Sequence, residues 1–108
     1  MTDGCVYIDD RYAAPEEAKI SIFDPGFTRG DAVYDTVSVW KGLFFRLDDH
    51  VARFFRSCAR ARLECPHPAE DVKRILAQCV HRAGLEASYV QMIVTRGNFE
   101  SLTNRVRS

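Results

Sequence analysis

The chain has 108 residues, of which 46% are hydrophobic and 28% are charged. This composition is typical of one soluble globular domain, and the length excludes two full domains. Its 15 basic and 15 acidic residues give a formal net charge of zero, so no strong field favours nucleic acid or an anionic membrane.

Other sequence features narrow the class further. The N-terminus has no cationic stretch followed by an apolar core, and no run of about 18 apolar residues occurs, so we expect neither secretion nor membrane spanning. The cysteines show no CxxC pairing and no histidine at zinc spacing, which predicts no structural metal site. They are Cys5, Cys58, Cys65 and Cys79. A reduced, cytoplasmic setting fits this pattern best.

The first third of the chain contains short β-prone runs separated by turns. Residues 5–8 favour a strand, Asp9 and Asp10 indicate a turn, and residues 11–13 are expected to return as an antiparallel partner. Residues 15–18 interrupt regular structure, and the Asp-Pro-Gly sequence at 24–26 predicts a further turn.

A β-hairpin is predicted over residues 33–46. Strand side chains alternate between the two faces, which gives one mainly aliphatic face with Val33, Asp35, Val37 and Val39. The opposite face, with Tyr34, Thr36, Ser38 and Trp40, is more typical of a pocket lining than of a core. Lys41 and Gly42 form the tight turn, and residues 43–46 form the return strand.

Two amphipathic helices and a strand follow. Asp48 is the predicted N-cap of the first helix, which runs to about Leu63. Its apolar stripe consists of Val51, Phe54, Phe55, Cys58, Ala59 and Leu63. The second helix begins near Pro68, ends at Gly84, and buries Val72, Ile75, Leu76, Cys79 and Val80. The strand covers Tyr89 to Thr95, with Val90, Met92 and Val94 on one face.

These elements predict an α+β fold in which two helices pack on one side of a small, mainly antiparallel sheet. Residues 1–97 form the domain, and residues 98–108 complete no further element. We therefore expect a loop or frayed tail after residue 97.

Three polar side chains near the predicted hairpin could carry chemistry. Arg53 borders the apolar stripe of its helix, where a partly shielded guanidinium needs an anion; the alternative is an arginine that reaches past Phe54 and Phe55 to a surface carboxylate. Tyr34 could line a pocket or pack with its hydroxyl in water. His50 lies one turn before Arg53, on a face expected to be solvated or half-buried.

The arginines of the first helix, Arg53, Arg56, Arg60 and Arg62, are expected to form a solvated helix face. No excess positive charge or interleaved aromatic platform accompanies them, so an RNA site is not predicted.

Several sequence blocks together resemble one family. They are Gly26–Asp35, Val39–Gly42, Phe44–Arg53, Ser57–Cys58, Leu63–Pro66 and Val94–Gly97. The resemblance is to the N-terminal domain of the class IV (fold type IV) pyridoxal-phosphate aminotransferases. This family includes branched-chain, D-amino acid and (R)-selective amine transaminases and aminodeoxychorismate lyase. The resemblance covers residues 20 to 97 approximately.

The resemblance implies roles for individual residues. Arg53, the arginine of the H-x-x-R motif, would bind the phosphate of pyridoxal 5'-phosphate, which suits guanidinium geometry. Tyr34 and Thr36 would line the substrate pocket, and Trp40 and Phe45 would be mainly structural. The parent enzyme would be a homodimer that moves an amino group between an amino acid or amine and a 2-oxo acid.

The resemblance also implies that the catalytic lysine lies in a second domain. None of the three lysines of this chain matches its position. Lys41 is expected in the hairpin turn, Lys73 is expected on the exposed side of a helix, and the third is Lys19. We therefore expect no catalytic residue here, an inactive isolated chain, and a truncated interdomain linker or frayed tail over residues 98–108. Two alternatives stay open: a stand-alone, non-catalytic dimerisation module, and a fragment of an aminodeoxychorismate lyase.

Overall fold

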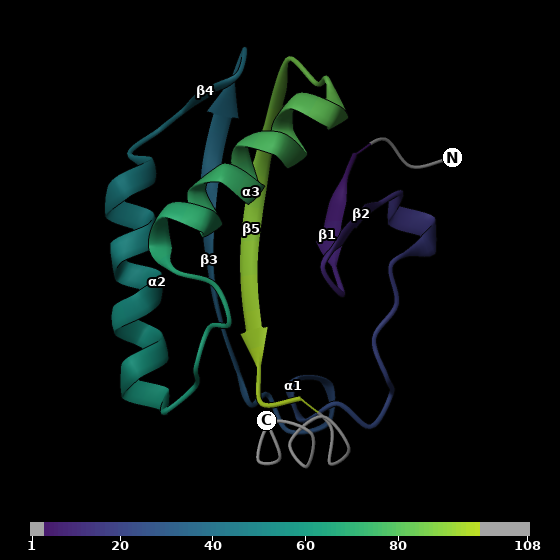
Figure 1. Ribbon diagram of the computed structural model, residues 1–108, viewed down its shortest axis with the longest axis vertical. Helices are drawn as coiled ribbons and strands as arrows, with labels where there is room; N and C mark the ends of the chain where they lie inside the picture. The colour runs from purple at the N-terminus through teal and green to yellow at the C-terminus, as the bar shows by residue number, and fades with distance from the viewer. Residues whose placement is uncertain (1–3, 98–108) are drawn as a thin grey trace.

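The computed structural model describes residues 4–97. The loop or frayed tail predicted for residues 98–108 lies outside this part of the chain. The elements in chain order are β1 (Val6–Ile8), β2 (Arg11–Ala13), a 3-10 turn (Pro15–Glu17), α1 (Pro25–Thr28), β3 (Ala32–Trp40), β4 (Leu43–Phe44), α2 (Leu47–Ala61), α3 (Ala69–Ala83) and β5 (Ala87–Thr95). Strands β1 and β2 form a small separate hairpin beside α3 (Figure 1).

The main sheet has three antiparallel strands in the order β4-β3-β5. Strands β3 and β5 pair along their full length, from Ala32 opposite Thr95 to Trp40 opposite Ala87. Helices α2 and α3 lie against one side of this sheet, with α2 contacting β3 and α3 contacting β5 (Figure 1). The predicted α+β fold, with two helices on one side of an antiparallel sheet, is confirmed.

The core lies between the sheet and the two helices. The alternation predicted for β3 and β5 is confirmed, because Val37, Met92 and Val94 are buried whereas Tyr34, Tyr89 and Ile93 on the other face are exposed. The helices contribute the buried side chains Val51, Phe54, Cys58, Val72 and Leu76. Burial of each large side chain contributes roughly 1.5–3 kcal/mol, so this layer stabilises the fold.

Helix α2 begins differently from the prediction. Arg46, not Asp48, occupies the N-cap position, with left-handed backbone angles (φ 56°, ψ 47°) and no side-chain cap. Asp48 lies inside the first turn, where its negative charge stabilises the helix by interacting with the positive end of the helix dipole. Because the chain turns into the helix at Arg46, the return strand β4 is limited to Leu43 and Phe44.

Helix α2 also ends earlier than predicted. Arg62 adopts a left-handed conformation (φ 56°), and the Leu63 amide donates to the Cys58 carbonyl at 2.9 Å. This is a Schellman-type ending, and the buried Leu63 supplies the apolar contact that accompanies it. Ala59, which the predicted stripe included, is exposed.

Helix α3 and strand β5 follow the prediction closely. The helix ends at Gly84 in a left-handed conformation, as expected, and Pro68 occupies the N-cap position. Strand β5 starts at Ala87, two residues before the predicted Tyr89. No helix in residues 4–97 is long and apolar enough to cross a membrane.

Arg96, just after β5, connects three parts of the fold. Its Nε donates to Asp31 at 3.1 Å. Its two terminal nitrogens donate to the carbonyls of Arg62 and Ala61, at 2.6 and 3.0 Å. Those carbonyls belong to the C-terminal end of α2, where intrahelical partners are lacking. The bonds therefore tie β5, α2 and the segment before β3 together.

Gly26 makes the same region close-packed. A Cβ atom at this position would lie 2.6 Å from the Thr95 methyl carbon. The neighbouring Asp24 carboxylate accepts from the Gly26 amide at 2.7 Å and from the Thr95 hydroxyl at 3.0 Å. The turn predicted at 24–26 thus starts the short helix α1, held against the end of β5.

We expect Arg96→Ala to lower the free energy of unfolding by about 1–2 kcal/mol, because it leaves two helix-end carbonyls and Asp31 without their donor. Urea unfolding of the purified chain measures this loss. Arg56→Ala is the matched control, since Arg56 is an exposed arginine of α2, and we expect it to stay within about 0.5 kcal/mol of wild type. Equal losses in the two variants would contradict the connecting role of Arg96.

The cysteines provide a second test of the packing. All four are free; Cys58 and Cys79 are buried, whereas Cys5 and Cys65 are partly accessible. Burial, reinforced by the nearby Cys5, raises the pKa of Cys79 to about 12, and burial also raises the pKa of Cys58. Because the thiolate is the reactive form, iodoacetamide at about pH 8 should label Cys5 and Cys65 first. Peptide mass spectrometry over time measures this order, and early labelling of Cys58 or Cys79 would disprove the predicted packing.

Candidate functional site

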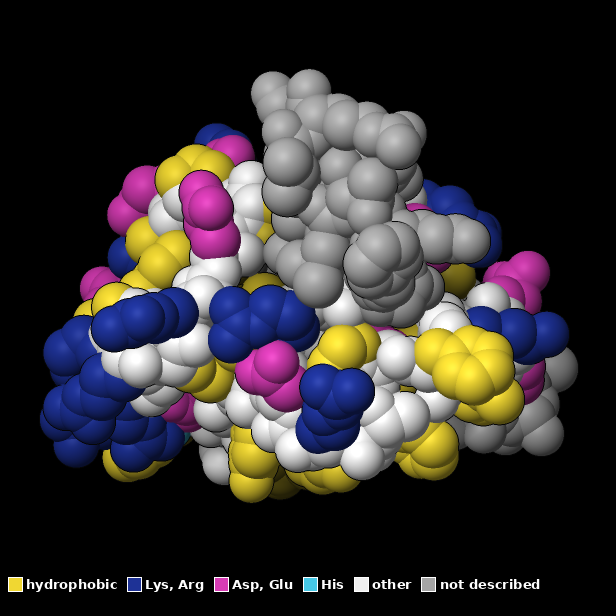
Figure 2. Space-filling view, turned by 90° about the horizontal axis from the view of Figure 1, so that it is seen from below, with side chains coloured by type: hydrophobic (Ala, Val, Ile, Leu, Met, Phe, Trp, Pro, Cys, Tyr) yellow, Lys and Arg dark blue, Asp and Glu magenta, His cyan; other side chains and the backbone are white. Residues whose placement is uncertain are grey.

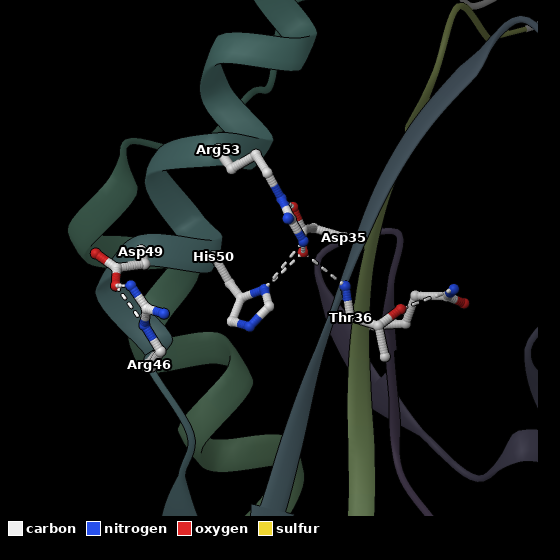
Figure 3. A network of polar contacts seen from close by, with 7 residues as sticks. Asp35, Thr36, Arg46, Asp49, His50 and Arg53 are labelled. Carbon is white, nitrogen blue, oxygen red and sulfur yellow. Dashed lines mark hydrogen bonds and ion pairs between the residues drawn. The ribbon is translucent and has the colours of Figure 1, made fainter.

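Asp35 is a buried carboxylate on the core side of β3, where it is only 5% exposed. Its Oδ2 accepts from Arg53 Nε at 2.8 Å, and its Oδ1 accepts from Arg53 Nη2 at 2.9 Å. His50 Nδ1 lies 2.8 Å from Oδ1, and the Thr36 amide donates to the same oxygen at 3.0 Å. Figure 3 shows the Arg53 and His50 side chains converging from α2 on this carboxylate.

The spacing along α2 explains this convergence. His50 and Arg53 are three residues apart, so they lie one above the other on the same side of the helix. That side borders the buried stripe of Val51 and Phe54 and faces β3. A carboxylate cannot be buried among valines unless charged or polar partners satisfy it, and the two α2 side chains supply those partners.

The bonds change the acidity of Asp35. The hydrogen bonds from Arg53 lower the pKa of this carboxyl, the His50 contact and the Arg53 charge add to the effect, and burial opposes it; the result is a pKa of about 2. Asp35 in turn raises the pKa of Arg53. Both groups are therefore charged throughout the physiological range.

Arg53 is held on one side and open on the other. Its Nε and Nη2 contact Asp35, and its side chain is 60% exposed. Among residues 4–97, no hydrogen bond is found for Nη1. A guanidinium has two N–H donors on that nitrogen, so Arg53 can still bind an external anion.

A shallow hollow of about 320 Å³ lies beside Arg53, and it is lined by Tyr34, Asp35, Thr36, Arg53 and Ser57. Residues from both faces of β3 reach it because β4 pairs with β3 only at Val39 and Trp40. Within the described residues, the first half of β3 has a strand partner on the β5 side only. The hollow therefore lies at a free strand edge next to α2.

The structure places the sequence-predicted residues as follows. Arg53 meets an anion, as expected at the helix–sheet boundary, but that anion is the buried Asp35 and not a surface carboxylate. Tyr34 is 65% exposed on the outer face, and Thr36 beside it accepts a hydrogen bond from Gln91 at 3.3 Å. All three line the same hollow.

Sequence reasoning missed Asp35 as a site residue and left His50 on a solvated or half-buried face. One signal was available: Asp35 stands on the aliphatic face of a strand, where a carboxylate needs partners. The following helix offers histidine and arginine at a spacing that can provide them.

The remaining arginines in and directly after α2 agree with the predicted solvated face. Arg56, Arg60 and Arg62 are exposed. Seen from below, Lys and Arg side chains gather at the left of the molecule, and others lie at its centre and right near acidic side chains (Figure 2). In residues 4–97 no group of three or more histidine, cysteine, aspartate or glutamate side chains is arranged to hold a metal ion.

The environments of two lysines are also defined. Lys41 occupies the hairpin turn, as predicted, and lies 3.8 Å from Glu86. The prediction for Lys73 is wrong: its side chain is 25% exposed and bridges Asp48 of α2 at 2.9 Å and Glu70 at 3.2 Å. Hydrogen bonds to these carboxylates raise the pKa of Lys73.

The pKa of Asp35 predicts how stability depends on pH. A carboxyl whose pKa falls from 3.8 to about 2 on folding contributes about 2 kcal/mol above pH 5, and this contribution is lost as pH falls from about 4 toward 2. Carbon-13 NMR of the Asp35 carboxyl measures the midpoint directly, and urea unfolding at about pH 6 and about pH 3 measures the loss. A midpoint at or above the ordinary value of 3.8 would contradict the assigned bonds.

Comparisons with known proteins agree with the fold. A D-alanine aminotransferase of Listeria monocytogenes is 30% identical over 92 residues, which cover 85% of this chain and 32% of that protein. Among solved structures, a branched-chain amino acid aminotransferase of T.th., complexed with N-(5'-phosphopyridoxyl)-L-glutamate, superposes with a TM-score of 0.84 at 24% identity. That match covers 92% of this chain and 35% of the other.

A branched-chain aminotransferase of Thermoproteus uzoniensis, with norvaline, gives a TM-score of 0.77 at 26% identity, over 91% of this chain and 35% of the other. The chain thus spans about a third of the length of the relatives it matches. The family model for amino-transferase class IV matches residues 32–106, more than half of the sequence. With the fold and this match in agreement, the chain belongs to the class IV aminotransferases.

Proposed function

We propose that this chain forms the part of a pyridoxal-phosphate-dependent aminotransferase in which Arg53 binds the cofactor phosphate and Tyr34 and Thr36 line the substrate pocket. The observation that carries the proposal is the guanidinium of Arg53, fixed by Asp35 through one edge and open at Nη1. The substrates would be an amino acid or amine and a 2-oxo acid, and the parent enzyme would be a homodimer.

The residues at the hollow fit a phosphate. Arginine binds phosphate through parallel N–H donors, and the hydroxyl-bearing residues Tyr34, Thr36 and Ser57 line the same hollow. The neighbouring structures support the choice of cofactor, because two of them contain phosphopyridoxyl-glutamate or pyridoxamine 5'-phosphate. The four free cysteines fit a reducing compartment such as the cytoplasm.

Each residue would have a limited task. Arg53 would hold the phosphate and so fix one end of the cofactor, while Tyr34 and Thr36 would shape the space in which the amino donor lies. When bound, pyridoxal phosphate supplies the electron sink for amino-group transfer. The protein groups of this chain supply binding and orientation, which bring the reacting groups into register.

The lysine that forms an imine with the cofactor would have to come from outside this chain. A lysine that forms an imine near neutral pH needs a lowered pKa, whereas two carboxylates raise the pKa of Lys73. Lys41 is 61% exposed beside Glu86, and Lys19 is exposed before the first long helix. We therefore infer that the chain alone does not transaminate.

Phosphate-dependent binding tests the role of Arg53. We expect pyridoxal 5'-phosphate to bind the chain about tenfold more tightly than pyridoxal, because only the former offers a charged partner to Nη1. Arg53→Ala should abolish the difference, and Arg56→Ala, on the exposed side of the same helix, should keep it. Isothermal titration calorimetry measures both affinities. An undiminished difference in Arg53→Ala would refute the proposal.

The inference about lysine has its own test. After incubation with pyridoxal 5'-phosphate and reduction with borohydride, we expect no lysine to carry a stoichiometric pyridoxyl group, since an imine-forming lysine needs a lowered pKa that these environments do not provide. Peptide mass spectrometry measures the occupancy at Lys19, Lys41 and Lys73. Full modification at one of them would show that the chain carries its own reactive lysine.

A further inference from the structure

The Asp35 carboxylate is fixed from two elements at once. Its own strand holds it through the Thr36 amide, at 3.0 Å from Oδ1. Helix α2 holds it through Arg53 and His50. The carboxylate is also buried, so it cannot rotate without breaking several charge-assisted hydrogen bonds in a poorly solvated place.

Two bonds from a fixed carboxylate set the plane of a guanidinium. Nε and Nη2 of Arg53 meet Oδ2 and Oδ1 at 2.8 and 2.9 Å, which is a bidentate pair with one allowed relative orientation. Nη1 is then the only guanidinium nitrogen that faces away from Asp35. A free arginine side chain has about 2 kcal/mol of rotamer entropy to lose on binding a ligand, and Arg53 has already lost much of it.

His50 contacts the same carboxylate oxygen, Oδ1, that Arg53 Nη2 contacts. Since a carboxylate oxygen only accepts, the His50 Nδ1 that lies 2.8 Å from Oδ1 carries the proton. The His50 side chain is 21% exposed, so its contact with Asp35 is shielded from most of the solvent. This contact opposes any swing of the carboxylate with Arg53.

We propose that Asp35 is a positioning residue, supported by His50, which orients Arg53 so that Nη1 meets the cofactor phosphate; the inference rests on the proposed function, in which Arg53 binds that phosphate. Asp35 also cancels the charge of Arg53, so the phosphate contact depends on orientation more than on net charge. Prior ordering of a binding group strengthens binding because less entropy is lost when the ligand arrives.

The test compares binding with side-chain order in the full chain. The binding measure is the ratio of the affinities for pyridoxal 5'-phosphate and pyridoxal, which isolates the phosphate contact. The variants are Asp35→Asn, His50→Ala and His50→Asn, whose amide N–H can occupy the place of Nδ1. Nitrogen-15 relaxation of the arginine Nε–H groups in the unliganded wild type measures order, with Arg56 and Arg60 as exposed controls on the same helix.

We expect Asp35→Asn to lower the affinity ratio about threefold, a partial loss because Arg53 is still present. We expect His50→Ala to lower it less, and His50→Asn to restore it. Arg53 Nε–H should be as ordered as the backbone, unlike Arg56 and Arg60. A folded Asp35→Asn variant with the wild-type ratio would overturn the positioning role while leaving the proposed function intact.

The relaxation measurement decides the matter if Asp35→Asn does not fold. An Arg53 Nε–H group as mobile as that of Arg56 would then overturn the proposal, and an ordered one would support it. Equal affinity of wild type for the two ligands would refute the phosphate role of Arg53 itself, and the positioning role would fail with it. The two failures are therefore distinguishable.

Discussion

The bidentate ion pair between Asp35 and Arg53 is the interaction on which the site depends. It crosses from the core side of β3 to α2 and places a charged group at the boundary between sheet and helix. Without Arg53 and His50, a carboxylate between Val33 and Val37 would be buried without compensation, at a cost of several kcal/mol. The strand and the helix are therefore constrained to one relative position by a polar contact as well as by packing.

A second constraint is the short strand β4. A return strand that paired with β3 over its whole length would cover the edge beside Tyr34 and Thr36. Because Arg46 turns left-handed and starts α2, β4 ends at Phe44, and this edge stays free. Residues from opposite faces of one strand can then line a common hollow with Arg53 and Ser57. The turn at Arg46 thus helps to form the hollow as well as to start the helix.

The sequence predicts most of the fold because its strongest patterns are periodic. The alternation along residues 33–40 is compatible only with a strand that buries its valines. The apolar stripe that begins at Val51 is compatible only with a helix that buries its valine and phenylalanines. The predictions are wrong at the two ends of α2, where an unusual backbone conformation sets the helix boundary. Arg46 and Arg62 are non-glycine residues with positive φ, and nothing in an arginine side chain predicts a left-handed turn.

The site was less accessible to sequence reasoning for a different reason. Arg53, Tyr34 and Thr36 could be selected as candidates, but their common location depends on the free β3 edge. Asp35 was placed on the correct face, yet its importance depends on a pairing across 18 residues of sequence. Lys73 shows the same difficulty, because it belongs to the contact between two helices and bridges Asp48 and Glu70.

The energetics of Asp35 and Arg53 favour an orienting role over a purely stabilising one. A buried carboxylate loses its hydration on folding, and well-packed apolar side chains in place of a buried ion pair are often as stable or more stable. Here only one partner is buried, since the Arg53 side chain stays 60% exposed. Stability alone would be served equally well by another valine at position 35. What a valine could not do is fix the plane of the guanidinium and leave one edge free, and that geometry is what binding of an anion requires.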